Sequence, residues 1–148
     1  MTVHRMDHVG FVVEDLPAAI AFFLELGLEL EGEAEVGGEW ADRLLGLRDV
    51  RTDIAVVRGP DGARIELSTF RSPGLAGSPP AAAVNVPGIP RLTFVVDAVD
   101  DTFDRLHELG AELVGEVAQY EDVYRYCYVR GPAGVIIGLV EELRAEGR

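Results

Sequence analysis

An internal repeat constrains this chain more than any other feature. The segment FVVEDLPAAIAFFLELGLELEGE at 11–33 aligns without a gap on FVVDAVDDTFDRLHELGAELVGE at 94–116 when the sequence is shifted by 83 positions. In both copies apolar residues recur at the spacing of one helical face, and a glycine follows at Gly27 and Gly110, where helices commonly end. The chain is therefore expected to fold as two like units, each with an amphipathic helix between strands.

A second pair of matching segments extends the repeat. The sequence GPDGARIE at 59–66 matches GPAGVIIG at 131–138, now at an offset of 72, so the first copy holds 11 additional residues between its matched segments. These residues are expected within 34–52, where GGEWADRLLGL can form a short extra helix. Each G-P-x-G is typical of a tight turn between two strands.

Each unit is predicted to follow the order βαβββ, which with one helix per four strands indicates an α+β fold. The strands are expected near 6–13, 28–34, 53–58 and 63–70 in the first unit, and near 90–97, 111–117, 124–130 and 135–141 in the second. The Pro-, Gly- and Ala-rich segment 71–89 is predicted to be a linker between unit one, 1–70, and unit two, 90–142. Neither unit has enough core alone, so the pair is predicted to form a single domain, 1–148.

Charge and composition exclude several classes of partner and chemistry. The formal net charge is −13, and a field of that sign repels nucleic acids and anionic membranes. All 13 cationic side chains are Arg, which excludes a catalytic lysine. The sequence has no G-x-S-x-G, Walker or G-x-G-x-x-G motif, which argues against serine hydrolases and nucleotide-binding folds.

The same composition gives an expected location. A single cysteine, Cys127, cannot form an intrachain disulfide and fits a reducing compartment. No apolar run approaches the ~20 residues that a membrane span requires, and the N-terminus lacks the apolar region of a signal peptide. The chain is therefore expected to be soluble and cytoplasmic.

Strand alternation predicts which side chains share the polar face of the first unit. Val9 and Phe11 are expected to point toward the helix, together with Ile65 and Leu67. The other face then carries His8, Gly10, Arg64, Glu66 and Ser68. An imidazole and a carboxylate on facing strands are donors that a divalent metal with N/O preference binds.

These features resemble one known family. The segment DHVGFVVEDL, the strand that begins within GPDGARIE and carries its Ile-Glu, and the duplicated βαβββ order are similar to the vicinal oxygen chelate superfamily. That group includes glyoxalase I, methylmalonyl-CoA epimerase, extradiol dioxygenases and the fosfomycin and bleomycin resistance proteins. The resemblance implies eight strands rolled into one cup around a divalent ion such as Zn, Ni, Mn or Fe, with one ligand from the first and one from the last strand of each unit.

The resemblance assigns His8 and Glu66 as metal ligands, and Glu66 also as the catalytic group. The positions that match them in unit two are Arg91 and Gly138, and neither side chain can bind a metal. Two readings of the first pair stay open: a two-ligand metal site completed by water and substrate, or a metal-free pair with His8 hydrogen-bonded and Glu66 in a salt bridge. Arg91 either pairs with Glu66 or binds a carboxylate, phosphonate or enolate oxygen of a ligand.

Several further side chains are candidates for substrate binding. Tyr124, Tyr126 and Tyr128 alternate on one face of a predicted strand, where they either donate hydrogen bonds to a ligand or pack against neighbouring strands. Ser68 shares the predicted polar face with Glu66. Cys127 falls on the opposite face from the tyrosines and is expected to be inert core.

Two functions from different classes follow from this reading. The first is a glyoxalase- or epimerase-like enzyme, a lyase or isomerase, in which Glu66 takes a proton from carbon next to a carbonyl of a small, oxygen-rich metabolite. A dioxygenase fits less well because iron(II) sites of that kind use two His and one carboxylate. The alternative is a metal-free small-molecule binder of the bleomycin-resistance kind. The resemblance also implies a homodimer.

Overall fold

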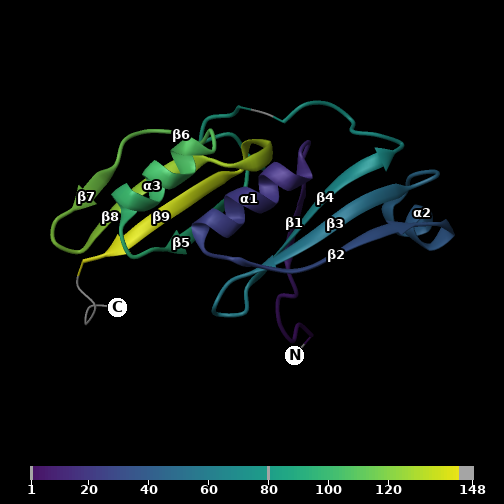
Figure 1. Ribbon diagram of the computed structural model, residues 1–148, viewed down its shortest axis with the longest axis horizontal. Coiled ribbons are helices and arrows are strands. Elements are labelled where there is room, and N and C mark those ends of the chain that lie inside the picture. The colour runs from purple at the N-terminus through teal and green to yellow at the C-terminus, as the bar shows by residue number, and fades with distance from the viewer. Residues whose placement is uncertain (1, 80, 144–148) are drawn as a thin grey trace. The chain divides into compact units, whose positions relative to one another are not determined.

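The computed structural model describes residues 2–79 and 81–143, and Figure 1 traces the chain through them. The chain divides into two compact units, Met1–Ser78 and Pro79–Arg148. Each unit contains one β-sheet with both parallel and antiparallel pairs, and one α-helix of about three turns packs on it. None of the helices in the described ranges is long and apolar enough to cross a membrane.

Unit one has a four-stranded sheet in the order β1-β4-β3-β2. Its outer strand β1 runs parallel to β4, and the other pairs are antiparallel. The elements are β1 (Val9–Val12), α1 (Leu16–Leu26), β2 (Glu29–Gly37), α2 (Glu39–Leu45), β3 (Arg51–Arg58) and β4 (Arg64–Ser72). The short helix α2 lies in the predicted insertion and extends from the end of β2 (Figure 1).

Unit two repeats this order around a second sheet, β5-β9-β8-β6, with β7 also paired to β8. Again the first strand, β5, runs parallel to the last, β9. The elements are β5 (Arg91–Val95), α3 (Val99–Glu108), β6 (Glu112–Leu113), β7 (Ala118–Tyr120), β8 (Tyr124–Arg130), the 3-10 turn η1 (Pro132–Gly134) and β9 (Ile136–Glu142). The predicted α+β class and the βαβββ repeat are confirmed.

Three predicted strands differ clearly from the structure, and one of them, expected at 28–34, continues to Gly37 as β2. The first strand was expected at 6–13, but β1 spans only Val9–Val12, and its pairing with β4 starts at Val9 opposite Ile65. Of the strand expected at 111–117 only Glu112–Leu113 forms, as β6, and a separate strand that was not predicted, β7, follows at Ala118–Tyr120. Leu113 lies opposite Val129 and Ala118 opposite Tyr126, so the first segment has more residues than β8 can pair and leaves the ladder between them.

Helix α1 is defined by residues close to it in sequence. The Asp15 carboxylate accepts a hydrogen bond from the Ala18 N–H at 3.0 Å, and Gly27 ends the helix with φ of 116°. Asp15 therefore satisfies one of the free N–H groups of the first turn, and glycine adopts the left-handed conformation without strain. The buried face of α1 packs on β3 and β4, with the Phe23 ring 6.1 Å from that of Phe11.

Helix α3 is capped from a distant strand instead. Its N-cap residue, Ala98, has no side chain that can accept a hydrogen bond. The Glu141 carboxylate of β9 takes that place and accepts from the Val99 N–H at 3.0 Å. Beside it, the Arg125 guanidinium donates two hydrogen bonds of 2.9 Å to Asp100 in the first turn, so strands β8 and β9 both hold the start of α3.

Replacing Glu141 by Ala is expected to lower the free energy of unfolding by about 1 kcal/mol, since the Val99 N–H loses its acceptor. Urea denaturation measures the change. Glu112→Ala, at an exposed position of β6, is the matched control and should change stability by less than about 0.5 kcal/mol. Equal effects of the two substitutions would contradict the capping role.

Candidate functional site

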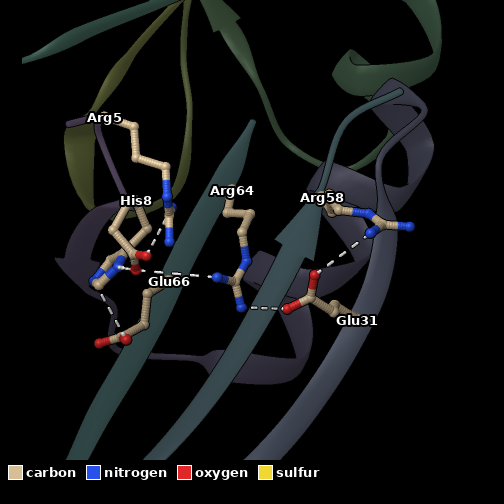
Figure 2. A network of polar contacts seen from close by, with 7 residues as sticks. Arg5, His8, Glu31, Arg58, Arg64 and Glu66 are labelled. Atoms are coloured by element: carbon tan, nitrogen blue, oxygen red, sulfur yellow. Dashed lines mark hydrogen bonds and ion pairs between the residues drawn. The ribbon is translucent and has the colours of Figure 1, made fainter. Parts of the chain in front are cut away.

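The predicted pair His8 and Glu66 is brought together within unit one. In the parallel pairing of β1 with β4, Gly10 lies opposite Glu66, and His8 precedes Gly10 by two residues in the extended segment before β1. His8 Nε2 lies 3.4 Å from Glu66 Oε2, with the two side chains 38% and 33% exposed. Figure 2 shows the imidazole and the carboxylate facing one another beside β4. A ligand from solvent can therefore reach both groups.

Asp7 holds the other nitrogen of the imidazole. Its Oδ2 lies 2.8 Å from His8 Nδ1, and this hydrogen bond, followed by that from Arg5, lowers the pKa of the Asp7 carboxyl from its usual value. Since an ionised carboxylate only accepts, Nδ1 carries a proton and donates to Asp7. Nε2 is then the nitrogen presented to Glu66, and a proton or a metal ion at Nε2 would offset the repulsion between its lone pair and the carboxylate.

Arg64, also expected on this face, is neutralised by other acids. Its guanidinium contacts Glu31, which also lies 3.9 Å from the Arg58 guanidinium, and it approaches Asp7 Oδ2 to 3.9 Å. Figure 2 shows this network running across the strands beside the His8–Glu66 pair. Within the described residues His8 is the only basic side chain within ion-pair distance of Glu66, so the second oxygen, Oε1, is left for a ligand.

The pair supplies two of the donors that a divalent ion requires. Two ligands at about 2.1 Å in tetrahedral geometry lie roughly 3.4 Å apart, which matches the separation of Nε2 and Oε2. In the described ranges no group of three or more His, Cys, Asp or Glu side chains is placed to hold a metal. The donor types and spacing fit an ion, but water or substrate would have to provide its other ligands.

The strand register identifies the equivalent positions in unit two. Thr93 lies opposite Gly138 in the parallel pairing of β5 with β9, as Gly10 lies opposite Glu66 in unit one. Arg91 precedes Thr93 by two residues, as His8 precedes Gly10. The sequence offsets thus paired the right positions, and the second unit has neither metal donor.

The register also reveals an exchange that sequence comparison of the ligand positions missed. Each unit has one glycine in the facing pair, but on opposite strands: Gly10 faces Glu66, whereas Gly138 faces Thr93. A Cβ atom at Gly138 would lie 2.5 Å from Thr93 Oγ1, while one at Gly10 would meet nothing closer than 3.6 Å. Thr93 therefore occupies the space where a side chain at position 138 would begin.

A row of hydroxyl groups covers this part of unit two. The Tyr128 hydroxyl donates to the Tyr126 hydroxyl at 3.4 Å, and Tyr126 donates to Thr93 Oγ1 at 3.3 Å. The Arg91 guanidinium lies 5.5 Å from the centre of the Tyr128 ring. The hydrogen bond with Tyr126, together with burial, raises the pKa of Tyr128, so its phenol remains a donor at neutral pH.

The tyrosines also pack on one another, as the packing reading of this segment predicted, while hydrogen bonding to a ligand stays a prediction. Successive ring centres along Tyr124, Tyr126 and Tyr128 lie 5.9 and 5.2 Å apart, and Tyr120 of β7 stacks on Tyr124 across the strands at 5.6 Å. Cys127 is buried on the other face, and burial raises the pKa of its thiol to about 11. It remains a protonated, inert thiol at neutral pH.

Ser68 lies two residues beyond Glu66 on β4 and is partly exposed. It shares the face of Glu66, because Ile65 and Leu67 on the alternate positions are buried. The predicted division of β4 into a core face and a polar face is therefore confirmed.

A duplicated βαβββ unit with parallel first and last strands, and an imidazole–carboxylate pair across them, defines an α+β protein of the glyoxalase type. The chain belongs to the Glyoxalase/Bleomycin resistance protein/Dioxygenase superfamily, whose family model matches residues 5–139. This confirms the resemblance to the vicinal oxygen chelate superfamily.

Individual proteins agree with this assignment. A glyoxalase family protein of Bacillus cereus is 50% identical, with 97% of each chain covered and a TM-score of 0.91. The uncharacterised protein YwbC of Bacillus subtilis is 25% identical over 132 residues, which are 88% of this chain and 91% of YwbC. A mutant of maize glyoxalase I, 17% identical with a TM-score of 0.67, matches 94% of this chain with 47% of its own and shares the fold.

Proposed function

We propose that the chain is a glyoxalase- or epimerase-like enzyme, a lyase or isomerase, that moves a proton at carbon next to a carbonyl in a small, oxygen-rich metabolite. The observation that supports this proposal is the His8–Glu66 pair, 3.4 Å apart and open to solvent on both side chains. A carboxylate in such a position can reach a carbon-bound proton, whereas a fully buried ion pair cannot.

In this proposal Glu66 is the general base. Its Oε2 lies 3.4 Å from His8 Nε2, which holds it when Nε2 carries a proton or a metal ion, and Oε1, which has no donor among the described residues, takes the proton from carbon. His8 orients the carboxylate, and Asp7 in turn orients the His8 ring through Nδ1 at 2.8 Å. The negative charge that develops on the substrate oxygens then requires hydrogen-bond donors or a cation.

We assign substrate binding to Ser68, Arg91, Tyr124 and Tyr126. Ser68 is supported by its position on the same face and strand as Glu66. Arg91 and Tyr126 both contact Tyr128, Arg91 at its ring and Tyr126 at its hydroxyl. Their guanidinium and hydroxyl groups are the donors that we assign to ligand oxygens. Tyr124 continues the same row of rings.

His8 and Glu66 are the residues that would hold a divalent ion such as Zn, Ni, Mn or Fe(II). When bound, such an ion would act as a Lewis acid that stabilises negative charge on substrate oxygens.

The expected homodimer is also part of the proposal. The edge strands of a sheet, β1 and β2 in unit one, are surfaces that a second copy of the chain could cover.

Proton exchange in D2O tests the proposal. The protein, with and without Mn, Ni or Zn, is incubated with a panel of 2-hydroxy ketones and 2-hydroxy acids, and NMR follows loss of the carbon-bound proton next to the carbonyl. The wild type is expected to exchange at least one compound, and Glu66→Gln to slow that exchange by about 100-fold or more, because the amide cannot accept the proton.

Glu29→Gln is the matched control, since Glu29 lies exposed on β2, and it should leave the rate unchanged. Equal rates for the wild type and Glu66→Gln, or no exchange with any compound or metal, would remove the enzymatic proposal. The second candidate, a metal-free binding protein, is favoured by the donor-rich face of unit two, where Arg91 and Gly138 replace metal ligands. It predicts ligand binding with no exchange and no gain in thermal stability from added metal.

A further inference from the structure

Two arginines share one face and one row of the sheet of unit two. In the register, Arg91 of β5 lies opposite Ile136 of β9, and Ile136 lies opposite Arg130 of β8. Side chains opposite one another in a sheet point to the same face, so Arg91 and Arg130 stand on one face with a single strand between them. Neither contacts a carboxylate within the described residues, although acidic residues outnumber Arg by 26 to 13 in the sequence.

Arg130 also has a donor without a partner. Its Nη1 is buried and donates to no acceptor in the described part of the chain. A buried, charged donor of this kind costs free energy unless it is paired, so native proteins rarely leave one without a reason. An anion bound on this face would satisfy it.

The hydroxyl groups of the same face are aligned in one direction. The row beside the two arginines holds Thr93 and Tyr128 on either side of Gly138. Tyr128 donates to Tyr126, and Tyr126 donates to Thr93 Oγ1. The proton of the Thr93 hydroxyl is then the end of the chain and is free of a partner in the described residues.

We propose that this face of unit two, formed by Arg91, Arg130 and the hydroxyls of Thr93, Tyr126 and Tyr128, binds the carboxylate of a small organic acid. A planar guanidinium matches a carboxylate through two parallel N–H···O bonds. A carboxylate carries one negative charge, whereas a phosphate monoester carries nearly two, and a protein of net charge −13 repels the latter more strongly. In unit two, hydrogen-bond donors would therefore bind the ligand at the positions where the metal ligands are missing.

This assignment rests on the proposed function, since it names a group that the substrate carries, a carboxylate. The substrate would then be a 2-hydroxy or 2-oxo acid and not a neutral ketone. Binding is measured separately from proton exchange, so the two can fail independently. If glycolate binds through Arg91 but no compound exchanges its proton, the anion site stands and the enzymatic proposal falls. Exchange of neutral ketones without glycolate binding gives the opposite result.

The experiment is a titration of the 15N-labelled full-length protein with glycolate, followed by amide chemical shifts of β5 and β9. Glycolamide, which has the same size without the charge, is the matched ligand. Glycolate is expected to give saturable shifts and glycolamide none. Arg91→Gln and Arg130→Gln should each weaken glycolate binding by about 10-fold or more, because each loses a charged hydrogen bond. Arg91→Lys should fall between Arg91→Gln and the wild type because it keeps only the charge.

Arg105→Gln removes a charge from α3, which packs on β8 and β9, and should leave glycolate affinity unchanged. The amide spectrum of each variant reports whether it folds. The proposal is overturned if folded Arg91→Gln binds glycolate as tightly as the wild type, or if glycolamide binds equally well. Tighter binding of methyl phosphate than of glycolate, with the same dependence on Arg91, would replace the carboxylate by a phosphate.

Discussion

A Gly138→Glu variant is expected to lose about 4 kcal/mol of free energy of unfolding. Its Cβ atom would lie 2.5 Å from Thr93 Oγ1 and 3.1 Å from the Thr93 Cβ and Cγ2 atoms, and forcing side chains into occupied space costs about 1–3 kcal/mol. The added carboxylate would also lose its hydration without a paired cation, which costs further. Urea denaturation monitored by circular dichroism measures the loss.

Three variants separate this steric cause from others. Gly138→Ala carries only the overpacking and should lose about 2 kcal/mol, whereas Gly10→Ala, at the equivalent position of unit one, should lose less than about 1 kcal/mol because its nearest neighbour is 3.6 Å away. In a Thr93→Gly background the effect of Gly138→Ala should largely disappear, as a double-mutant cycle reveals. Additive effects of Thr93→Gly and Gly138→Ala would contradict the exchange described for these strands.

Phe23→Ala is expected to cost about 4 kcal/mol, in the range measured for large aromatic residues removed from protein cores. The Phe23 side chain is 0% exposed and lies between the rings of Phe11 and Phe22, at 6.1 and 5.2 Å. Its removal leaves a cavity between α1 and the sheet of unit one, because these neighbours belong to regular elements that relax only partly. The midpoint of urea unfolding gives the change.

The repeat supplies the control for this prediction. Leu106 is the residue of α3 that matches Phe23, and it is also fully buried. Phe23→Leu therefore places in α1 the side chain that the second unit uses, and should cost about 1.5 kcal/mol or less. A loss for Phe23→Ala no greater than that for Phe23→Leu would show that the site collapses around the missing ring.

The repeat predicted the order of the elements because the spacing of its apolar residues indicates which side chains are buried in each unit. Leu16 and Phe23 in α1 and Val99 and Leu106 in α3 are all buried, as the shared helical spacing requires. The short β6 within 111–117 and the separate strand β7 after it were not predictable, since they depend on how many residues β8 can pair. That number is set by the register of β8 with β9, which is a tertiary property.

The proximity of His8 to Glu66 was also predictable, because strand alternation puts both on one face, and the pairing of β1 with β4 places Glu66 opposite Gly10, two residues from His8. The hydrogen bond that Asp7 accepts from His8 Nδ1 was not, since an adjacent residue on an extended segment normally points to the other side. The role of Thr93 was missed because aligning the repeats compares ligand positions with each other and not with the residues that face them. That Arg91 and Glu66 share one cup stays a prediction.

The two helices differ in when their first turns can be completed during folding. Asp15 is three residues from the N–H that it satisfies in α1, so that cap forms as soon as the helix does. The acceptor for Val99 in α3 lies 42 residues further along the chain. On a ribosome, α1 is complete in its local contacts while the rest of its unit is still being made, whereas α3 emerges with its first turn open and gains its cap only after β9 has joined the sheet.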